Sequence, residues 1–384
     1  MGEIIAKTLF GLENILAEEL KQLNAKGIKL YNRAVGFEGD KKTVYKANYC
    51  LRTALKILLP IGEAVINNEA ELYQYIRTIK WENYLGVNDT LAVEVSLSTN
   101  IFKHSHFIAQ KIKDGIVDHF RDKYGTRPSV DLKNPVLRIN ALIQNNIVKL
   151  SRDSSGDSLH RRGYRVKQGP APINEVLAAG LIKLSGWNEK DPLIDFMCGS
   201  GTIPVEAALM ASRIYPGDLG KEYGFQKWKD YDRQMFKEAI KETKTDILKG
   251  TVNVFASDIS AEVIALARKH AQIAGVSDRI RFSISDFQHV TPPPPPGVVI
   301  VNPPYGERIV QDELNTLYSN MGNKFKKDFA GYNAWVISAN AEAFKFVGLK
   351  PSLKIQTFNG QLECRFNKYS MYDGSKKPHK IMNS

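Results

Sequence analysis

The sequence has little cysteine and no long apolar segment. Its three cysteines, Cys50, Cys198 and Cys364, are too few for a disulfide framework, and none lies in a C-x-x-C pair. This usage favours a reducing cytoplasm. No apolar run approaches the ~20 residues that span a bilayer, and the N-terminus lacks the charged-then-apolar pattern of a signal peptide. We therefore expect a soluble protein of the cytoplasm.

Metal-ligand spacing is missing as well. His104 and His106 lie two residues apart, so they do not share a helix face. No cysteine or carboxylate stands at ligand spacing beside them. We therefore predict no metal site.

Acidic residues are outnumbered by basic ones. The 384 residues include 53 Lys+Arg and 41 Asp+Glu, a net charge of +12. Residues 1–160 carry +4 and residues 161–384 carry +8, so the excess is spread over both halves. This distribution favours an extended polyanion surface over one basic tail. A basic surface that serves solubility alone is the alternative.

The length suggests two or three domains. Residues 1–65 and 66–155 each predict a small α+β unit, and in the second Ile108, Ile112 and Ile116 recur at steps of four along a helix. Helices are expected at 9–23, 44–50, 69–79, 104–124, 172–186, 204–211 and 261–274. Strands are expected at 35–37, 55–61, 91–97, 136–143, 147–152, 193–195, 252–258, 280–284, 298–301, 334–339, 353–358 and 361–369.

Three segments lie outside this regular pattern. Residues 212–250 form an insertion of mixed charge that we expect to be helical and to lie on the surface. Its aromatic residues are Tyr215, Tyr223, Phe225, Trp228 and Tyr231. Pro292 to Pro296 predict a stiff polyproline connector. The basic tail from Gly374 to Ser384 is expected to be mobile.

One stretch of the C-terminal half predicts a nucleoside site. An apolar strand ends at Asp195, the turn Cys198–Thr202 follows, and a helix begins near Pro204. Gly199 and Gly201 allow a ligand to approach the backbone closely. A dinucleotide fingerprint would need glycine in place of Pro204, and no phosphate-binding lysine is present. Because Asp195 would repel a pyrophosphate but can pair with an ammonium, we predict S-adenosylmethionine as the ligand.

Two further strand ends complete this predicted site. Asp258 ends the second strand, where a carboxylate can accept both ribose hydroxyls. Asp286 follows the third strand and can accept the adenine amine, while Phe287 packs on the ring. The predicted cofactor residues are Asp195, Cys198, Gly199, Ser200, Gly201, Thr202, Asp258, Ile259, Asp286, Phe287 and Asn302.

A fourth strand ends in the motif Asn302-Pro303-Pro304-Tyr305. The prolines fix the backbone and leave carbonyls without neighbouring amides. The Asn302 side-chain oxygen and the Pro303 carbonyl can both accept hydrogens from a planar NH₂ group. Such acceptance draws the nitrogen toward tetrahedral geometry and frees its lone pair. With Tyr305 stacked on the base, we predict catalytic roles for Asn302, Pro303, Pro304 and Tyr305.

Residues 156–171 predict a basic linker. Arg161, Arg162, Arg165 and Lys167 cluster around the aromatic Tyr164. A basic patch with an aromatic residue suits a nucleic-acid backbone and an unstacked base. Pairing of these arginines with acidic residues between the domains is an equal alternative.

The motifs resemble a known family. Residues 160–370 are similar to class I S-adenosylmethionine-dependent methyltransferases that modify exocyclic amines. The whole chain resembles the bacterial THUMP-domain RNA methyltransferases, and within them the 23S ribosomal RNA guanine-N2 methyltransferases. The matching stretches are Ser158 to Arg165, the Ala171-Pro172 helix, Asp195 to Thr202, Asp258, Asp286 and Asn302 to Arg308, with a weaker match at Leu9 to Glu13.

The resemblance implies the fold and the division of the chain. We expect an α/β protein whose C-terminal domain is a Rossmann-like seven-stranded methyltransferase, preceded by α+β ferredoxin-like and THUMP domains. The expected bounds are 1–65 for the ferredoxin-like segment, 66–155 for the RNA-binding THUMP domain, 156–171 for the linker and 172–384 for the methyltransferase domain. Bifunctional relatives carry a second methyltransferase domain after the tail, so a chain ending at Ser384 is expected to make a single modification.

The resulting hypothesis is an RNA methyltransferase that modifies an exocyclic purine amine, with guanine N2 in 23S ribosomal RNA favoured. One alternative is an adenine-N6 methyltransferase acting on RNA or DNA, because the Asn-Pro-Pro-Tyr motif specifies an amine and not a base. Another is an RNA-binding ribosome-assembly factor with vestigial activity. A nicotinamide dehydrogenase is excluded by Pro204 and the missing third glycine.

Overall fold

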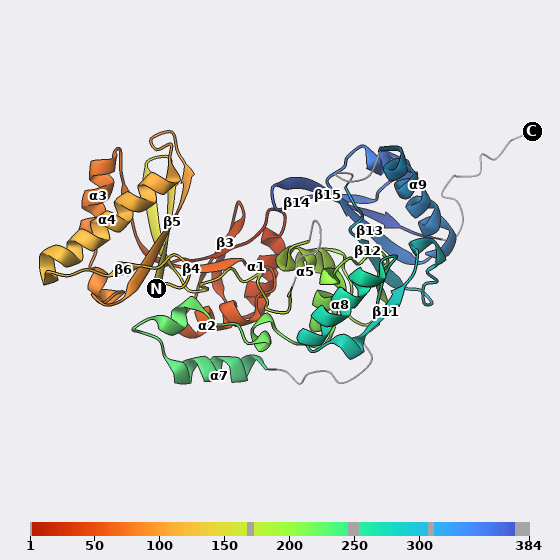
Figure 1. Ribbon diagram of the computed structural model, residues 1–384, viewed down its shortest axis with the longest axis horizontal. Helices are drawn as coiled ribbons and strands as arrows, with labels where there is room; N and C mark the ends of the chain where they lie inside the picture. The colour runs from red at the N-terminus through yellow and green to blue at the C-terminus, as the bar shows by residue number, and fades with distance from the viewer. Residues whose placement is uncertain (1, 167–172, 245–252, 306–310, 373–384) are drawn as a thin grey trace, which may run out of the picture. The chain divides into compact units, whose positions relative to one another are not determined.

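The computed structural model describes residues 2–166, 173–244, 253–305 and 311–372 (Figure 1). Lys167, the end of the linker and the tail from Gly374 lie outside these residues. The chain forms two compact units. We call Met1–Arg162 with Tyr215–Thr245 the N-terminal unit, and Gly163–Ile214 with Asp246–Ser384 the C-terminal unit. No helix among the described residues has the length and hydropathy needed to cross a membrane.

One mixed sheet runs through the N-terminal unit. Its strand order among the described residues is β2-β3-β1-β4-β8-β7-β5-β6. The strands are β1 (Ile4–Lys7), β2 (Lys26–Tyr31), β3 (Ala34–Glu38), β4 (Lys56–Val65), β5 (Thr90–Ser98), β6 (Ser129–Val130), β7 (Leu137–Gln144) and β8 (Ile147–Asp153). The long strand β4 pairs with β1 on one side and with β8 on the other, so it joins the two predicted α+β parts. The sequence analysis missed β1, β2 and β6.

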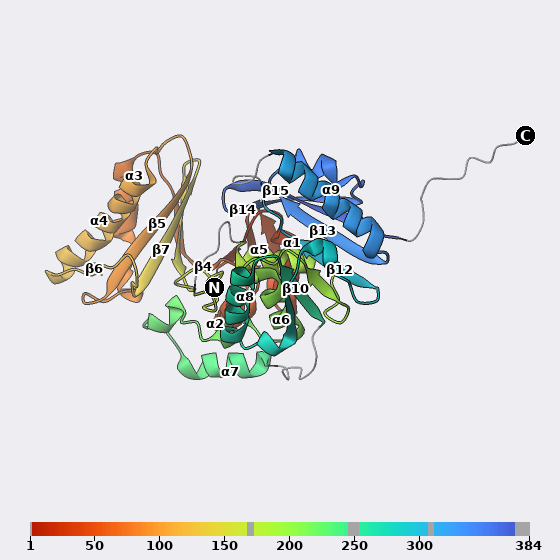
Figure 2. The same ribbon diagram turned by 45° about the vertical axis from the view of Figure 1, so that its right-hand side comes forward.

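The helices of this unit follow the predicted apolar spacing. They are α1 (Glu13–Gln22), α2 (Lys41–Cys50), α3 (Glu69–Thr78) and α4 (Ser105–Tyr124). Asp40 caps α2 by accepting the Thr43 N–H, and α4 ends at Gly125, whose φ of 70° is left-handed. Helices α3 and α4 pack side by side near β5 (Figure 2). Helix α4 buries its row of isoleucines.

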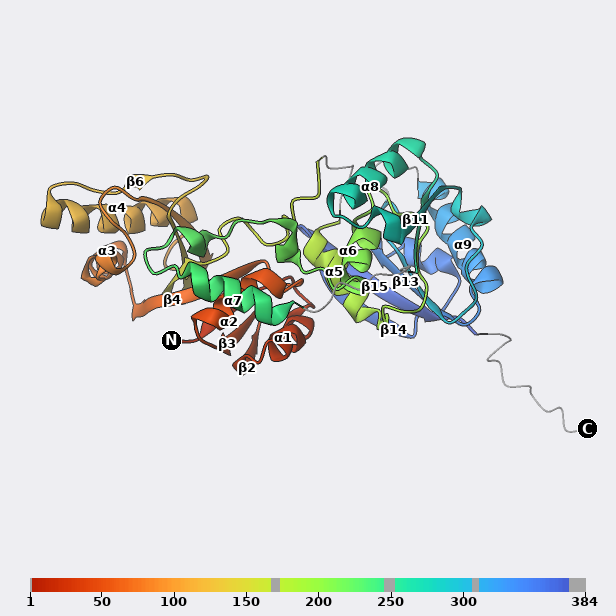
Figure 3. The same ribbon diagram turned by 90° about the horizontal axis from the view of Figure 1, so that it is seen from below.

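Most of the insertion, Tyr215–Thr245, belongs to the N-terminal unit. Its helix α7 (Arg233–Thr243) packs on α2, although the two are far apart in the chain (Figure 3). The Phe225 ring lies 4.5 Å from that of Tyr45, between centroids, and Trp228 is buried in the same core. The Arg152 guanidinium covers the Trp228 ring at 4.1 Å. The predicted helical structure is confirmed at Arg233–Thr243. The expected surface position is wrong for the aromatic side chains of the insertion, because they complete this core.

The C-terminal unit contains the predicted seven-stranded sheet. Its order among the described residues is β11-β10-β9-β12-β13-β15-β14. The strands are β9 (Leu193–Asp195), β10 (Val254–Asp258), β11 (Ile280–Ile284), β12 (Gly297–Val301), β13 (Tyr332–Ser338), β14 (Leu353–Asn359) and β15 (Leu362–Ser370). Strand β9 pairs in parallel with both β10 and β12. Strands β10 and β11 are therefore added on one side of β9, and β12 and β13 on the other. Such a reversal of strand order opens a crevice at the carboxyl ends of the strands.

Helices cover both faces of this sheet. Helix α6 (Thr202–Ala211) packs on β9 and β10, α8 (Ala261–Ile273) packs on β10 and β11, and α5 (Glu175–Leu184) packs on α6. Helix α9 (Gln311–Asp328) packs in another core, with Ile194, Val299 and Val301. The residues of β12 that alternate with Val299 and Val301 point to the opposite face of the sheet. They are buried too, as expected when helices cover both faces.

The sequence analysis did not predict α9. Its buried residues Leu314, Tyr318, Met321 and Phe325 recur at steps of three and four, so the periodic signal was present. The hairpin expected at Asn359-Gly360 is confirmed, with Gly360 at a φ of 64° between β14 and β15.

Candidate cofactor and substrate pocket

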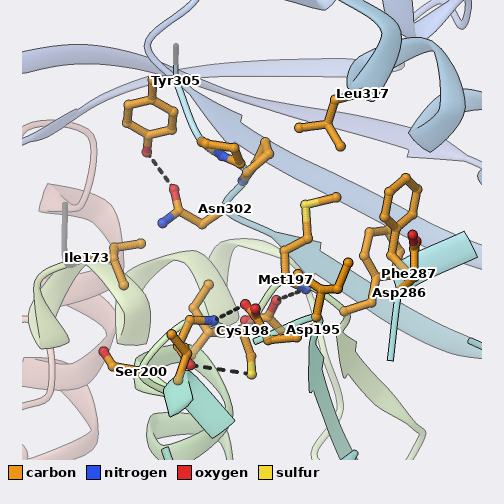
Figure 4. Close-up of a pocket in the computed structure, with 18 of the residues that line it drawn as sticks. Ile173, Asp195, Met197, Cys198, Ser200, Asp286, Phe287, Asn302, Tyr305 and Leu317 are labelled. Carbon is orange, nitrogen blue, oxygen red and sulfur yellow. Dashed lines mark hydrogen bonds between the residues drawn. The ribbon is translucent and has the colours of Figure 1, made fainter. Parts of the chain in front are cut away.

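A pocket of about 780 Å³ opens at the carboxyl ends of β9, β10 and β12 (Figure 4). It lies wholly within the C-terminal unit. Every predicted cofactor residue except Gly201 lines it, and so do all four residues of the Asn-Pro-Pro-Tyr motif. Strand order thus brings together residues that are more than one hundred positions apart in the sequence.

The two glycines of the turn serve different purposes. Gly199 has a φ of 53°, and an added Cβ there would meet nothing within 4 Å. Gly201 has a φ of 83°, and its added Cβ would lie 2.9 Å from the Ala267 Cβ on α8. Gly199 therefore leaves the pocket side of the turn open. Gly201 instead permits α6 and α8 to pack closely, which corrects the expected role in ligand approach.

Asp195 is a buried carboxylate at the floor of the turn. Its residue is 1 % exposed, and its Oδ1 accepts the Met197 N–H at 3.2 Å. Burial raises the pKa of Asp195 well above its ordinary value, and the nearby negative charge of Asp258 raises it further. A buried carboxylate in this state gains most from a cationic partner. The pocket therefore fits a ligand that brings an ammonium group.

Asp258 is held rigidly by backbone amides. Its Oδ2 accepts the Gly199 N–H at 3.1 Å, and its Oδ1 accepts the Ser260 N–H at 3.0 Å. Each carboxylate oxygen has more than one acceptor site, so both can still bind hydroxyl groups. The arrangement suits the binding of a ribose, and it links the Asp258 carboxylate to the glycine turn.

An apolar surface with one carboxylate lies at the end of β11. The Phe287 ring stacks on Phe196, with centroids 5.5 Å apart and planes 24° apart. Asp286 accepts the Gln288 N–H at 2.9 Å, which orients its side chain at the pocket. Ile259 lines the pocket while 71 % exposed, so an apolar side chain is available to cover a flat ring.

The Asn-Pro-Pro-Tyr motif shows one contact that the sequence analysis did not foresee. The Tyr305 hydroxyl donates to Asn302 Oδ1 at 2.6 Å (Figure 4). Burial raises the pKa of Tyr305, so its phenol remains a donor at neutral pH. Asn340 Nδ2 donates to the Tyr305 carbonyl at 3.3 Å. Tyr305 thus orients Asn302, while its stacking on a base stays a prediction.

The predicted RNA-binding residues of the linker do not form one exposed patch. Arg162 and Tyr164 are each 1 % exposed. Arg162 donates to the carbonyls of Leu159 and Arg52, and the Tyr164 hydroxyl donates to Glu206 at 3.2 Å. Their burial argues against direct contact with RNA.

Two of the remaining linker residues differ sharply in exposure. Arg165 forms an ion pair with Glu175 and has a side chain only 12 % exposed. The side chain of Arg161 is 68 % exposed and lies 3.6 Å from Asp157. Only Arg161 keeps the expected accessibility among the described residues of this set, since Lys167 lies outside them.

One face of α9 contributes residues that sequence analysis missed. Glu313, Thr316, Leu317 and Asn320 line the pocket at helical spacing. They lie on a different face from the buried row of α9. A sequence analysis that had recognised the buried row would therefore have identified them as candidate site residues. The other lining residues that were not predicted are Ile173, Phe196, Met197, Ile203, Val263, Leu266, Gln288 and Leu362.

Comparison with known proteins identifies the family. The model described as "RMKL-like, methyltransferase domain" matches residues 162–368, more than half of the chain. The chain belongs to the RMKL-like methyltransferases. A THUMP domain matches at residues 67–153, and an RlmL ferredoxin-like domain matches at residues 3–58. The predicted family and domain types are confirmed, whereas the exact bounds proposed from the sequence stay predictions.

Individual relatives cover nearly all of this methyltransferase. A Synechocystis sp. protein named "Putative RNA methyltransferase slr0064" is 38% identical, over 94% of this chain and 95% of the relative. The ribosomal RNA large subunit methyltransferase K/L of Psychromonas ingrahamii is 37% identical over 94% of this chain. The chain spans about half of that second relative, 49% of its length.

A solved structure supports the cofactor. The crystal structure of SMU.472 complexed with SAH has a TM-score of 0.86 and 26% identity, covering 97% of this chain and 99% of that one. The SAH bound to that protein agrees with the prediction of S-adenosylmethionine as the cofactor of this chain. The pocket fits it, because a buried carboxylate, a carboxylate held by amides and an apolar wall are its matching partners.

Proposed function

We propose that the protein methylates an exocyclic amine of a purine in RNA, with guanine N2 of 23S ribosomal RNA as the favoured target. The observation that carries the proposal is the presence of Asn302 and Pro303 in the same pocket as Asp195 and the glycine turn. Two acceptors for an amine and an anionic site for an ammonium therefore share one cavity.

The proposed cofactor site uses three carboxylates. Asp195 binds the ammonium, Asp258 binds the ribose hydroxyls, and Asp286 with Phe287 binds the adenine. S-adenosylmethionine supplies an electrophilic methyl group on a sulfonium. The turn residues Cys198, Ser200 and Thr202 shape the wall between these groups.

The protein's part in the chemistry is mainly orientation. The Asn302 oxygen and the Pro303 carbonyl accept the hydrogens of the target amine, which directs its lone pair toward the methyl group. Tyr305 holds the Asn302 amide through its hydroxyl. The target base leaves its stack to enter the pocket, at a cost of a few kcal/mol. No covalent nucleophile is required.

RNA is proposed as the substrate on three grounds. A THUMP domain is present, the net charge is +12, and the two relatives carry RNA methyltransferase names. Phosphate contacts by lysine and arginine should make affinity fall steeply with salt. The cytoplasm stays the expected location, in line with the low cysteine content.

Adenine N6 is the second candidate target, because the acceptor pair is complementary to any planar amine. The test is transfer of radiolabelled methyl groups from S-adenosylmethionine to total RNA, followed by mass spectrometry of the nucleosides. We expect N2-methylguanosine. N6-methyladenosine would identify the alternative, a methylated ring carbon would refute the mechanism, and binding without transfer would indicate an assembly factor.

A further inference from the structure

Arg165 was expected to bind RNA, but its contacts point inward. Its Nη2 donates to the Ile173 carbonyl at 2.5 Å and to Thr202 Oγ1 at 2.5 Å. Its Nε lies 3.6 Å from Glu175 Oε1, and Glu175 is itself buried. The guanidinium therefore has a carboxylate partner and two hydrogen-bond acceptors within the C-terminal unit, which offset the cost of its partial burial.

The two hydrogen-bond acceptors of Arg165 both belong to the pocket wall. Thr202 is the last residue of the glycine turn and the first residue of α6, and Ile173 precedes α5. Both line the pocket, while Glu175 lies in the first turn of α5. One planar side chain thus joins the helix that follows the turn to the start of the neighbouring helix, a task that suits the fixed fork of arginine.

A second support meets the same turn from α8. His270 Nδ1 lies 3.0 Å from the Ser200 carbonyl, which can only accept, so Nδ1 carries the hydrogen. Burial lowers the pKa of His270, and the positive charge of Arg165 lowers it further. The neutral imidazole and the arginine therefore hold the turn at two points on either side of Gly201, namely Ser200 and Thr202.

We propose that Arg165 is a positioning residue that sets the geometry of the turn Cys198–Thr202 for the amino-acid portion of S-adenosylmethionine. The inference rests on the proposed placement of the cofactor ammonium at Asp195 beside this turn. It replaces the expected role of Arg165 in RNA binding. The carboxylates proposed to bind the nucleoside portion lie on other strand ends, so that portion should depend much less on Arg165.

The test compares two ligands on the full-length protein by calorimetry. S-adenosylhomocysteine contains the amino-acid portion, and methylthioadenosine lacks it. Arg165→Met keeps the apolar stem and removes every donor, and it should weaken S-adenosylhomocysteine about tenfold or more. Methylthioadenosine should change by less than about twofold. Arg165→Lys keeps the charge without the fork and should fall in between.

Arg161→Met is the matched control, because Arg161 is an exposed arginine of the same segment. It should keep both ligand affinities and reduce the salt dependence of RNA binding, whereas Arg165→Met should leave that dependence unchanged. Unaltered affinity for S-adenosylhomocysteine in Arg165→Met would overturn the inference. Equal losses for both ligands would overturn it too, as would a loss confined to RNA.

These outcomes are separable from failure of the proposed function. Both ligands are measured without RNA, so a wrong target base leaves the result standing. A wild-type protein that bound S-adenosylhomocysteine no better than methylthioadenosine would refute the ammonium site itself. If Arg165→Met does not fold, the ligand ratio in Arg165→Lys decides in the same way.

Discussion

The turns that follow β9 and β12 enter one pocket but are built differently. The first uses positive φ at two glycines and follows a buried carboxylate whose pKa is raised. The second uses two prolines and a side-chain hydrogen bond between Tyr305 and Asn302. The first turn is thus suited to bind a positive charge that the ligand supplies. The second turn presents hydrogen-bond acceptors in a fixed direction. Substitutions should accordingly impair affinity at one turn and turnover at the other.

The largest effect is expected from Asn302→Ala in the second turn. Its contact with the substrate amine strengthens as the nitrogen pyramidalises, so turnover should fall by about 10²–10³-fold, as when one preorganised catalytic hydrogen bond is removed. Affinity for S-adenosylmethionine should stay within about twofold. Single-turnover methyl transfer and calorimetry check both values, and wild-type turnover would contradict the mechanism.

Asp195→Asn, at the first turn, should impair cofactor affinity, in contrast to the loss of turnover expected for Asn302→Ala. Loss of the ammonium partner should weaken S-adenosylmethionine by about 1.5–3 kcal/mol. At pH values where Asp195 ionises, the free variant should be more stable than the free wild-type protein, because asparagine avoids the cost of ionising a buried carboxyl. Calorimetry and thermal unfolding of the same sample measure the two effects. A variant that loses stability and keeps its affinity would refute the assignment.

The raised pKa of Asp195 also predicts a pH dependence. The pKa in the folded protein lies well above the ordinary value of 3.8, so the proton stabilises the free protein. This contribution is complete below the unfolded pKa and is lost as pH rises through the folded pKa. Affinity for the cofactor should rise over the same window, because only the carboxylate pairs with the ammonium. A pH profile of affinity that stays flat over this whole window would contradict the linkage.

Glycine replacements sharpen the contrast within the first turn. Gly201→Ala should cost about 1–3 kcal/mol of unfolding free energy, since its Cβ would collide with Ala267 on α8. Gly199→Ala meets no neighbour, so it should cost less stability and act mainly on cofactor affinity. Denaturant unfolding with and without S-adenosylhomocysteine separates the two. Equal stability losses would show that the distinction is wrong.

The smallest effect is expected from Tyr305→Phe. The variant keeps the ring and removes the hydrogen bond to Asn302. The activation free energy of methyl transfer should therefore rise by about 0.5–1.5 kcal/mol, which lowers turnover. Tyr305→Ala, which also removes the ring, should lose clearly more. If the two variants are equally impaired, the ring has no role in binding the base.

The sequence by itself determined the local features of this protein. The order of strands and turns, the left-handed glycines and the amine-accepting motif depend on nearby residues and on backbone preferences. The carboxyl ends of parallel strands share one edge of a sheet, so the strand pattern alone was enough to group Asp195, Asp258 and Asn302.

Only the tertiary structure decided which side chains are accessible. The same basic linker contains an exposed Arg161 and a buried Arg162, and no local signal distinguishes them. The aromatic insertion likewise completes a core whose other residues lie far away in the chain. Burial depends on partners brought together by long-range packing, and an arginine that binds carbonyls has the same sequence appearance as one that faces solvent.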